Sequence, residues 1–265
     1  MTTTIFYFTG SGNALAIART LASRIEGAEV ARIAQSLNPG AAGESTRVGI
    51  VTPVYAWGLP RMVADFVNQL ALSPGAYVFA VATNAGSAGR TLIQLRDRLR
   101  KRGGDLHAGF SVLGDFQAYL PGMDDMAIIR LVSWLGRKDI PRSFSERVDE
   151  IVSAIESSAP HAPETTNRSV DAISRAVYPL ALRMMRTFDK SFSVSDACTS
   201  CGICARVCPR ENVTLKNGKP DWNRDCESCY ACLLSCPSKA IGVRGSHPSD
   251  AVRHPEIALN ELFLR

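Results

Sequence analysis

The sequence predicts an α/β domain built on a parallel sheet, followed by a small cysteine-rich domain. Two observations support this prediction. Over the first 115 residues, β-branched and apolar runs alternate with helical patterns, which is the order of a parallel sheet covered by helices on both faces. All eight cysteines of the 265-residue chain then lie between Cys198 and Cys236, and residues 1–197 contain none.

Each element of the first domain has its own signal. In the first expected helix, Leu15, Ala18 and Leu21 recur at helical spacing. Pro60 stands near the start of the second helix, and Gly103 follows the end of the third. The expected strands are residues 4–8, 29–33, 47–54, 76–83 and 106–113. The expected helices are residues 13–24, 60–70, 87–102 and 144–157.

The middle of the chain is less regular. Residues 127–135 are apolar and expected to be helical, and residues 158–169 are rich in Ser, Pro, Thr and Asn, as in a linker. Residues 170–186 carry one apolar stripe interrupted by arginines, and Pro179 is expected to kink or break that helix. We interpret it as a docking helix between two domains, with a peripheral membrane-surface helix or a partner-binding helix as alternatives.

The cysteines form two copies of one motif, Cys-x2-Cys-x2-Cys-x3-Cys-Pro, which start 28 residues apart. The first copy contains Cys198, Cys201, Cys204 and Cys208, and the second contains Cys226, Cys229, Cys232 and Cys236. This run resembles the one by which bacterial-type ferredoxins hold two 4Fe–4S clusters. Two structural zinc sites are the alternative. Zinc ribbons, however, normally use two Cys-x2-Cys pairs that lie far apart in the sequence, not three cysteines in one loop.

The resemblance to ferredoxins implies crossed ligand sets, because the fourth cysteine of each copy binds the other copy's cluster. One cluster would take Cys198, Cys201, Cys204 and Cys236, and the other would take Cys226, Cys229, Cys232 and Cys208. Between the copies, Asn217 and Gly218 predict a two-residue hairpin turn. Tyr230 stands where the first copy has Gly202, and it either tunes a cluster or packs in the core.

A first loop, directly after the first strand, is typical of a phosphate site. It consists of Thr9, Gly10, Ser11, Gly12, Asn13 and Ala14, and it opens a helix, where N–H groups and hydroxyls bind anions. It lacks the lysine of a Walker A loop, and Leu15 replaces the third glycine of a dinucleotide fingerprint. It resembles the phosphate loop of flavodoxins, with Ala14 in place of the last threonine.

A second loop follows the strand at residues 47–54 and includes Pro53, Tyr55, Ala56, Trp57 and Gly58. It resembles the second flavodoxin loop. That resemblance implies that Trp57 stacks on the isoalloxazine ring and that the Gly58 peptide turns its carbonyl toward N5–H of the reduced ring, which would require a positive φ. The alternative is that Trp57 is a core residue.

A third loop, with Thr83, Asn84, Ala85 and Gly86, resembles the flavodoxin loop that meets the pyrimidine edge. It carries no aromatic residue, so the second face of the ring is either open or covered by Phe116 or Tyr119. All three loops follow strands of the expected sheet, and ligands of doubly wound sheets bind at the carboxyl ends of the strands.

The whole chain resembles flavodoxin–ferredoxin fusion proteins of anaerobic and facultative prokaryotes. Residues 1–157 would form a flavodoxin-like FMN-binding domain, a doubly wound parallel sheet of strand order 2-1-3-4-5. Residues 158–189 would be a linker and docking helix, and residues 190–265 a small α+β two-cluster ferredoxin domain with a C-terminal tail. The resemblance implies FMN, two 4Fe–4S clusters and electron transfer.

We expect an electron carrier that passes single electrons between FMN and the clusters, to or from a partner redox protein. One alternative is an FMN-dependent reductase of a small molecule that uses the clusters as an internal wire. Another is a redox-responsive binding protein. No Ser–His–Asp set or paired carboxylates stand out in the sequence. An electron carrier is therefore favoured over a stand-alone oxidoreductase, and an enzymatic activity of its own stays open.

The net charge of +5 does not indicate a nucleic-acid partner. Two clusters and a flavin phosphate would bring it to about −1. No apolar stretch is long enough to span a membrane, and residues 1–5 lack the pattern of a secretory signal. We therefore expect a cytoplasmic protein.

Overall fold

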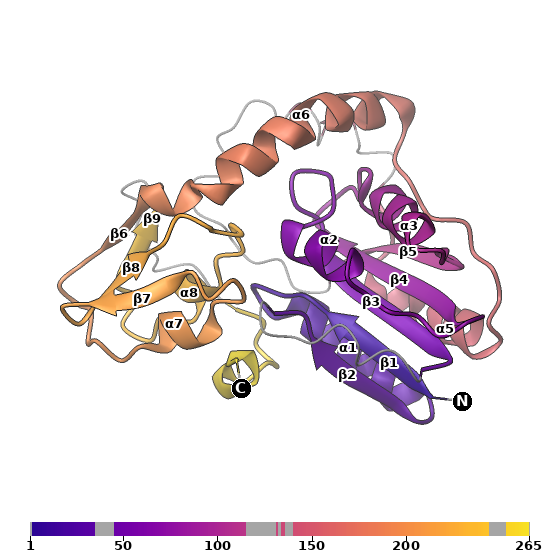
Figure 1. Cartoon of the computed structure of the whole chain (residues 1–265), viewed down its shortest axis with the longest axis horizontal. Helices are drawn as coiled ribbons and strands as arrows, with labels where there is room; N and C mark the ends of the chain where they lie inside the picture. The colour runs from indigo at the N-terminus through magenta and orange to yellow at the C-terminus, as the bar shows by residue number, and fades with distance from the viewer. Residues whose placement is uncertain are drawn as a thin grey trace.

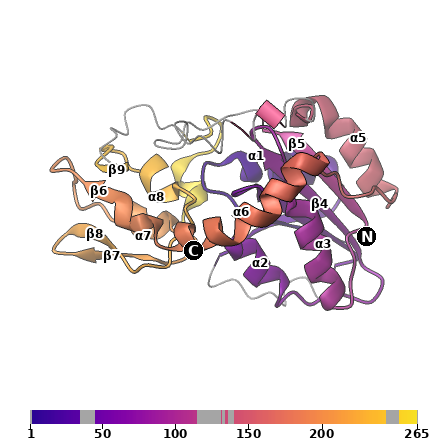
Figure 2. The ribbon, with the colours of Figure 1, turned by 90° about the horizontal axis from the view of Figure 1, so that it is seen from above.

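The computed structural model describes residues 2–34, 45–114, 131, 134–135, 140–243 and 253–264. A larger part contains the sheet, and a smaller part beside it contains all eight cysteines (Figure 1). One long helix crosses above both parts, and the last helical turn lies between them (Figures 1 and 2). Within the described residues, no helix is both long and apolar enough to cross a membrane.

The sheet has five strands in the order β2-β1-β3-β4-β5, and every neighbouring pair is parallel. The strands are β1 Thr3–Tyr7, β2 Ala28–Arg32, β3 Arg47–Pro53, β4 Tyr77–Asn84 and β5 Ala108–Leu113. This confirms the predicted flavodoxin-like, doubly wound topology. Because the strands are parallel, the loops after β1 and β3 open at the same edge of the sheet. The strand order reverses between these two strands.

Helices cover both faces of the sheet. The pair α1 Asn13–Arg24 and α5 Phe144–Glu156 covers one face, and the pair α2 Arg61–Val67 and α3 Thr91–Lys101 covers the other. Side chains alternate between these layers along a strand: Ile5 and Tyr7 of β1 pack with α1 and α5, whereas Phe6 and Phe8 pack with α2 and α3. Both faces are therefore apolar, as the uninterrupted strand sequences predicted.

The expected linker at residues 158–169 is partly tied to the sheet. His161 N–H donates to His107 O at 2.9 Å, Gly109 N–H donates to His161 O at 3.1 Å, and Glu164 N–H donates to Gly109 O at 3.0 Å. These bonds cover the outer edge of β5, which would otherwise expose unpaired backbone groups. The Ser and Pro content predicted a linker, and prolines are tolerated beside a sheet edge as well.

The docking helix is α6, which runs over Arg168–Arg186 and continues through Pro179. Of the expected kink or break at Pro179, the break does not occur. Pro179 and Arg175 both lie on the exposed side of α6, so the Arg175 carbonyl that proline leaves without a partner can be hydrated. Tyr178 Oη donates to Leu59 O of the large part, while Ser228 Oγ of the small part donates to Met185 O at 2.9 Å. The helix thus contacts both parts.

The small part is built from short elements. They are η3 Phe188–Ser191, β6 Phe192–Val194, α7 Ile203–Val207, β7 Val213–Lys216, β8 Lys219–Trp222, α8 Ala231–Leu234 and β9 Ile241–Val243. The last turn, η5 Leu259–Leu262, lies between the two parts (Figure 1). Strands β6 and β9 pair antiparallel, as do β7 and β8. The β7–β8 turn has Asn217 at φ 51° and Gly218 at φ 78°, which confirms the predicted two-residue hairpin.

Two sets of predictions lie outside the described residues. Phe116 and Tyr119 both belong to such a segment, and so does most of the helix expected at residues 127–135.

A buried arginine ties α5 to β5 and the segment after it. Arg147 donates to Ser111 O at 2.9 Å and to both carboxylate oxygens of Glu164 at 2.9 and 2.7 Å. Glu164 also accepts from Ser111 N–H at 2.7 Å. Burial alone would raise the pKa of Glu164, but the bonds from Arg147, Ser111 N–H and His161 outweigh it and lower that pKa.

We expect Glu164→Gln to lower the free energy of unfolding by about 1–2 kcal/mol, because it removes one of the two carboxylates that pair with buried Arg147, the other being Glu150. The melting temperature, followed by far-UV circular dichroism without oxygen, should fall by roughly 2–8 °C. Since folding lowers the Glu164 pKa, its contribution is complete at pH 7 and is lost only as the pH falls through the folded pKa. The exposed Asp149→Asn is the control, and an equal effect of both variants would contradict the assignment.

Candidate functional site

The three loops singled out in the sequence meet at the carboxyl edge of the sheet. The second loop (residues 53–60) bonds to the third (residues 83–87) through Val54 N–H and Thr83 O at 3.1 Å. The first loop (residues 9–14) meets the third beside Gly114. A Cβ at Gly114 would lie 2.9 Å from Thr83 Oγ1 and 3.2 Å from Asn13 Nδ2. The tertiary structure therefore brings all three loops together.

The first loop is shaped by Gly12. Its φ of 106° is a conformation that suits glycine, and its N–H donates to Thr9 Oγ1 at 2.9 Å. Helix α1 starts at the next residue, Asn13. The first turn of a helix has N–H groups without intrahelical acceptors and a partial positive charge. This donor set, with the Thr9 and Ser11 hydroxyls close by, suits an anion such as a phosphate.

The second loop contains a tight turn in which Tyr55 and Gly58 exchange backbone hydrogen bonds of 3.0 and 2.9 Å. The positive φ angles of this turn belong to Ala56 (48°) and Trp57 (58°), not to Gly58 as expected. Gly58 is needed here for another reason. A Cβ at Gly58 would lie 2.3 Å from the Tyr178 ring of α6. The sequence showed a docking helix but gave no signal that Tyr178 would reach this loop.

The third loop is held by the Asn84 side chain. Its Nδ2 donates to Ser111 Oγ at 3.0 Å and to Val112 O at 3.2 Å, and its Oδ1 accepts from Gly86 N–H at 2.9 Å. Ala85 is exposed. A Cβ at Gly86 would meet nothing within 4 Å, so this loop borders open space.

The second cysteine motif lies directly against the first loop. A Cβ at Gly10 would lie 2.0 Å from the carbonyl oxygen of Cys229, so only a glycine permits this approach. Tyr55 packs in the same cluster as Cys229. Burial raises the pKa of Tyr55 well above its ordinary value, and the neighbouring Cys229 adds to that effect.

Polar contacts between α2 and the small part surround this approach. Arg61 pairs with Asp225 at 3.1 Å, and Arg210 pairs with Asp65 at 2.9 Å. Glu227 is 4% exposed, and its Oε1 accepts from Met62 N–H at 3.1 Å. Burial raises the pKa of Glu227 to about 7, against the opposing effect of Met62 N–H and Arg61.

The C-terminal segment also rests on the first loop. His254 N–H donates to Ser11 O at 2.7 Å, and a Cβ at Gly12 would lie 2.8 Å from His254 Cβ. Arg19 of α1 pairs with Glu261 at 2.5 Å, and Leu264 N–H donates to Arg206 O at 2.8 Å. This segment therefore connects α1 with the small part (Figure 1). An isolated histidine in the sequence carried no signal of this contact.

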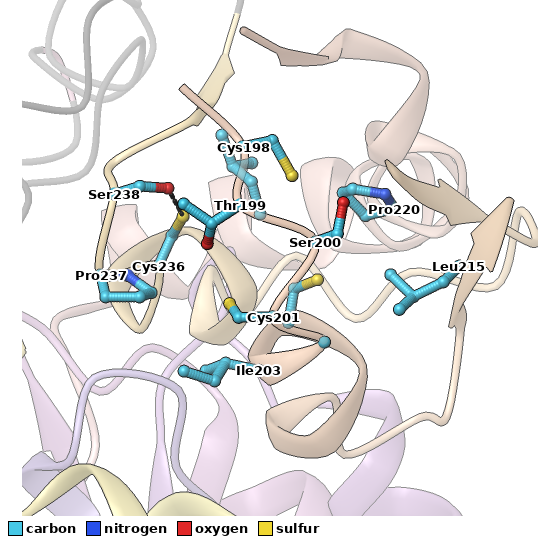
Figure 3. A pocket seen from close by; sticks show the side chains of 13 residues that line it. Cys198, Thr199, Ser200, Cys201, Ile203, Leu215, Pro220, Cys236, Pro237 and Ser238 are labelled. Carbon is cyan, nitrogen blue, oxygen red and sulfur yellow. Dashed lines mark hydrogen bonds between the residues drawn. The ribbon is translucent and has the colours of Figure 1, made fainter. Parts of the chain in front are cut away.

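The eight thiols are free and fall into two groups. The outer set, Cys198, Cys201, Cys204 and Cys236, lines one pocket of about 320 Å³, including its opening to solvent (Figure 3). Cys201 is exposed, and Ser238 Oγ lies 3.6 Å from Cys236 Sγ. Burial raises the pKa of Cys204 to about 11, and the thiols of Cys201 and Cys236 add to this effect.

The inner set consists of Cys208 from the first motif and Cys226, Cys229 and Cys232 from the second. Burial raises the pKa of Cys226 to about 12, with a further contribution from nearby Cys208. Burial also raises the pKa of Cys232 well above its ordinary value, and Cys208, Cys229 and Cys226 all add to it. Within the described part of the chain, no three His, Cys, Asp or Glu side chains are placed as ligands of a single metal ion.

Comparison with protein families assigns the small part. Residues 197–241 match the 4Fe-4S dicluster domain family. No curated protein matches the chain. The chain joins this domain to a parallel sheet with the flavodoxin-like strand order.

Solved structures similar to the chain include several flavodoxins. A flavodoxin from the domain Archaea shares 15% identity and a TM-score of 0.36, over 58% of this chain and 99% of its own. Two-electron reduced Megasphaera elsdenii flavodoxin shares 19% identity and a TM-score of 0.37, over 42% of this chain and 86% of its own. A Lactobacillus acidophilus flavoprotein in complex with FMN shares 13% identity and a TM-score of 0.35, over 42% of this chain and 92% of its own.

We expect Gly10→Ala to separate the first loop from the second cysteine motif, because the added methyl overlaps the Cys229 carbonyl. Overpacking of this kind costs about 1–3 kcal/mol. Amide hydrogen exchange in residues 226–234, measured by mass spectrometry, should therefore rise about tenfold or more. Gly86→Ala, whose methyl meets open space, is the control. Equal exchange in the two variants would show that the contact does not hold the parts together.

Proposed function

From a flavodoxin-like sheet joined to a 4Fe-4S dicluster domain, we propose an electron-transfer protein. It would pass single electrons between FMN at the three loops and two 4Fe–4S clusters, and exchange them with a partner redox protein. The observation that carries this proposal is the direct approach of Cys229 to Gly10. It places a cysteine ligand loop against a loop suited to phosphate.

The residues of the three loops fit FMN. The N-terminus of α1, the positive φ of Gly12 and the Thr9 and Ser11 hydroxyls suit the phosphate. The second and third loops, including Tyr55, Trp57 and Asn84, stand where the ring would lie. Bound FMN exchanges one or two electrons, whereas each cluster exchanges one. Stacking of Trp57, and cover by Phe116 or Tyr119, stay predictions.

The inner and outer sets fit two four-cysteine clusters. Each set combines three cysteines of one motif with the fourth cysteine of the other motif. This composition agrees with the crossed ligand sets expected from the ferredoxin resemblance. Backbone N–H groups also point at sulfur: Asn212 N lies 3.3 Å from Cys208 Sγ, Ser228 N 3.2 Å from Cys226 Sγ, and Ala240 N 3.3 Å from Cys236 Sγ. Such donors stabilise thiolate ligands.

The two sets differ in what they face. The inner set is packed against the first loop through Cys229, so its cluster would be the neighbour of the flavin. The outer set opens to solvent beside Cys201, so its cluster would be the one that a partner protein approaches.

The proposal includes the division of the chain into an FMN-binding domain that ends at residue 157, a linker and docking helix that ends at residue 189, and a ferredoxin domain. It also includes a cytoplasmic location, where thiols stay reduced.

One observation favours an FMN-dependent reductase as a second candidate. The third loop borders open space at Gly86, and Ala85 is exposed, so a small molecule could reach that side. A reductase would consume its substrate without a protein partner, whereas a carrier would not.

Cofactor content tests the proposal directly. After purification without oxygen, we expect about one FMN, eight iron and eight acid-labile sulfide per chain. The measurements are flavin fluorescence after extraction, iron and sulfide assays, and the visible spectrum. Eight iron without flavin would contradict the role given to the first loop and leave a ferredoxin with an attached docking domain.

Cys208→Ala tests the crossed ligand sets. It should damage the cluster held by Cys226, Cys229 and Cys232. It should leave intact the cluster held by the other cysteines of the first motif, Cys198, Cys201 and Cys204. Cys236→Ala is the matched counterpart and should damage the outer cluster. Iron content and electron paramagnetic resonance of the reduced protein measure both. Loss of the outer cluster in Cys208→Ala would overturn the crossed assignment.

A further inference from the structure

We propose that Arg32, on the edge strand β2 of the flavodoxin-like part, sets the midpoint potential of the cluster held by the inner set. The residue lies more than 170 positions before the first cysteine of that set. The inference rests on the proposed function, because it requires a 4Fe–4S cluster on the inner thiols. It makes the potential of that cluster a property of both parts of the protein together.

The Arg32 side chain reaches across the boundary between the two parts. One terminal nitrogen donates to Val207 O at 3.1 Å, and the other donates to Leu262 O. Val207 directly precedes Cys208 in the chain. The Nε of Arg32 is buried and has no hydrogen-bond partner among the described atoms. A buried donor without an acceptor is costly, and a charged acceptor nearby would relieve that cost.

The electrostatic surroundings agree with this geometry. Burial lowers the pKa of Arg32, while Tyr7, Cys229 and Cys208 act in the opposite direction. Arginine keeps its charge in proteins. Arg32 therefore faces the Cys208 side of the inner set without a carboxylate partner among the described residues, whereas Arg210 on the same side is paired with Asp65 and Asp225.

The described lining of the outer set's pocket is different. None of the described residues that line its pocket is charged; apart from the four cysteines they are small, hydroxyl-bearing or apolar, such as Ser200, Leu215 and Pro220. The difference between the two sets is thus in the charge around them, since both use four cysteines.

A cation beside a cluster favours its reduced form. One-electron reduction, by the flavin or by the partner protein, adds one negative charge to a cluster that is already anionic. A fixed positive charge stabilises the reduced form more than the oxidised form, and the effect is large where water is excluded. Because Arg32 belongs to the other part of the chain, separation of the parts would lower the potential. By linkage, reduction of the inner cluster would tighten their docking.

The test is a redox titration of the full chain, followed by electron paramagnetic resonance, for the unsubstituted protein and Arg32→Gln. We expect the potential of one cluster to become more negative. The ratio of reduced to oxidised cluster at a fixed potential should fall about tenfold, which is about 59 mV for a one-electron couple. The cluster whose titration wave shifts should be the one whose signal Cys208→Ala alters. The midpoint potential of the other cluster should not change.

Two further variants separate charge from packing. Arg32→Lys keeps the charge and should keep most of the potential. Arg19→Gln removes a surface ion pair with Glu261 that also joins the two parts, and it should leave both waves unchanged. If Arg32→Gln does not retain its iron, Arg32→Met, which keeps the apolar stem, carries the same test.

The outcomes distinguish the two proposals. Eight iron with unchanged potentials in Arg32→Gln, or an equal shift in Arg32→Lys, would overturn the role of the Arg32 charge. It would leave the proposed function intact. Fewer than eight iron in the unsubstituted protein would overturn the two-cluster proposal itself.

Discussion

The arrangement of the molecule depends on one close backbone approach. The carbonyl of Cys229 reaches the first loop at Gly10, where any side chain would overlap it. Because that loop is also the start of α1, the same glycine-rich segment serves a predicted anion site on one side and a cysteine loop on the other. The distance between a flavin and a cluster would then be set by rigid backbone, not by a mobile linker.

The other contacts between the parts are both apolar and polar: Val207 and Ala231 of the small part pack in the core cluster of α1 and α5. Arg61 and Arg32 of the flavodoxin-like part reach into the small part, and Glu227 of the small part reaches the start of α2. The sheet part thus supplies cations to a region rich in thiols. Cluster-bound thiolates would be negative. The positive charges of the sheet part would therefore favour both docking of the two parts and the retention of electrons near the inner set. Helix α6 and the C-terminal segment close the same interface from two further directions.

Glycines at this interface show how sequence patterns and tertiary contacts differ. Gly58 was expected to supply a positive φ, but the turn places positive φ at Ala56 and Trp57. What Gly58 supplies is space for Tyr178 of α6. The two requirements look the same in a sequence, because both are met by a missing side chain. Pro179 was expected to kink or break α6, and residues 158–169 were expected to be a linker. In the structure α6 continues through Pro179, and residues 161–164 bond to the edge of β5.

The sequence by itself determined the helix α1 that starts at Asn13, the β7–β8 hairpin and the dicluster spacing of the cysteines, and its resemblance to flavodoxins implied the strand order. The helix, the hairpin and each cysteine motif depend on residues close by in the chain, where periodicity, turn residues and ligand spacing are local signals. Only the tertiary structure decided that Cys229 lies on Gly10, that Tyr178 lies on Gly58, and that Arg32 and His254 border the site. These pairs are between 120 and 250 positions apart, and no local pattern specifies which surfaces of two folded parts meet. Docking is decided by the fit of shapes and charges that exist only after each part has folded.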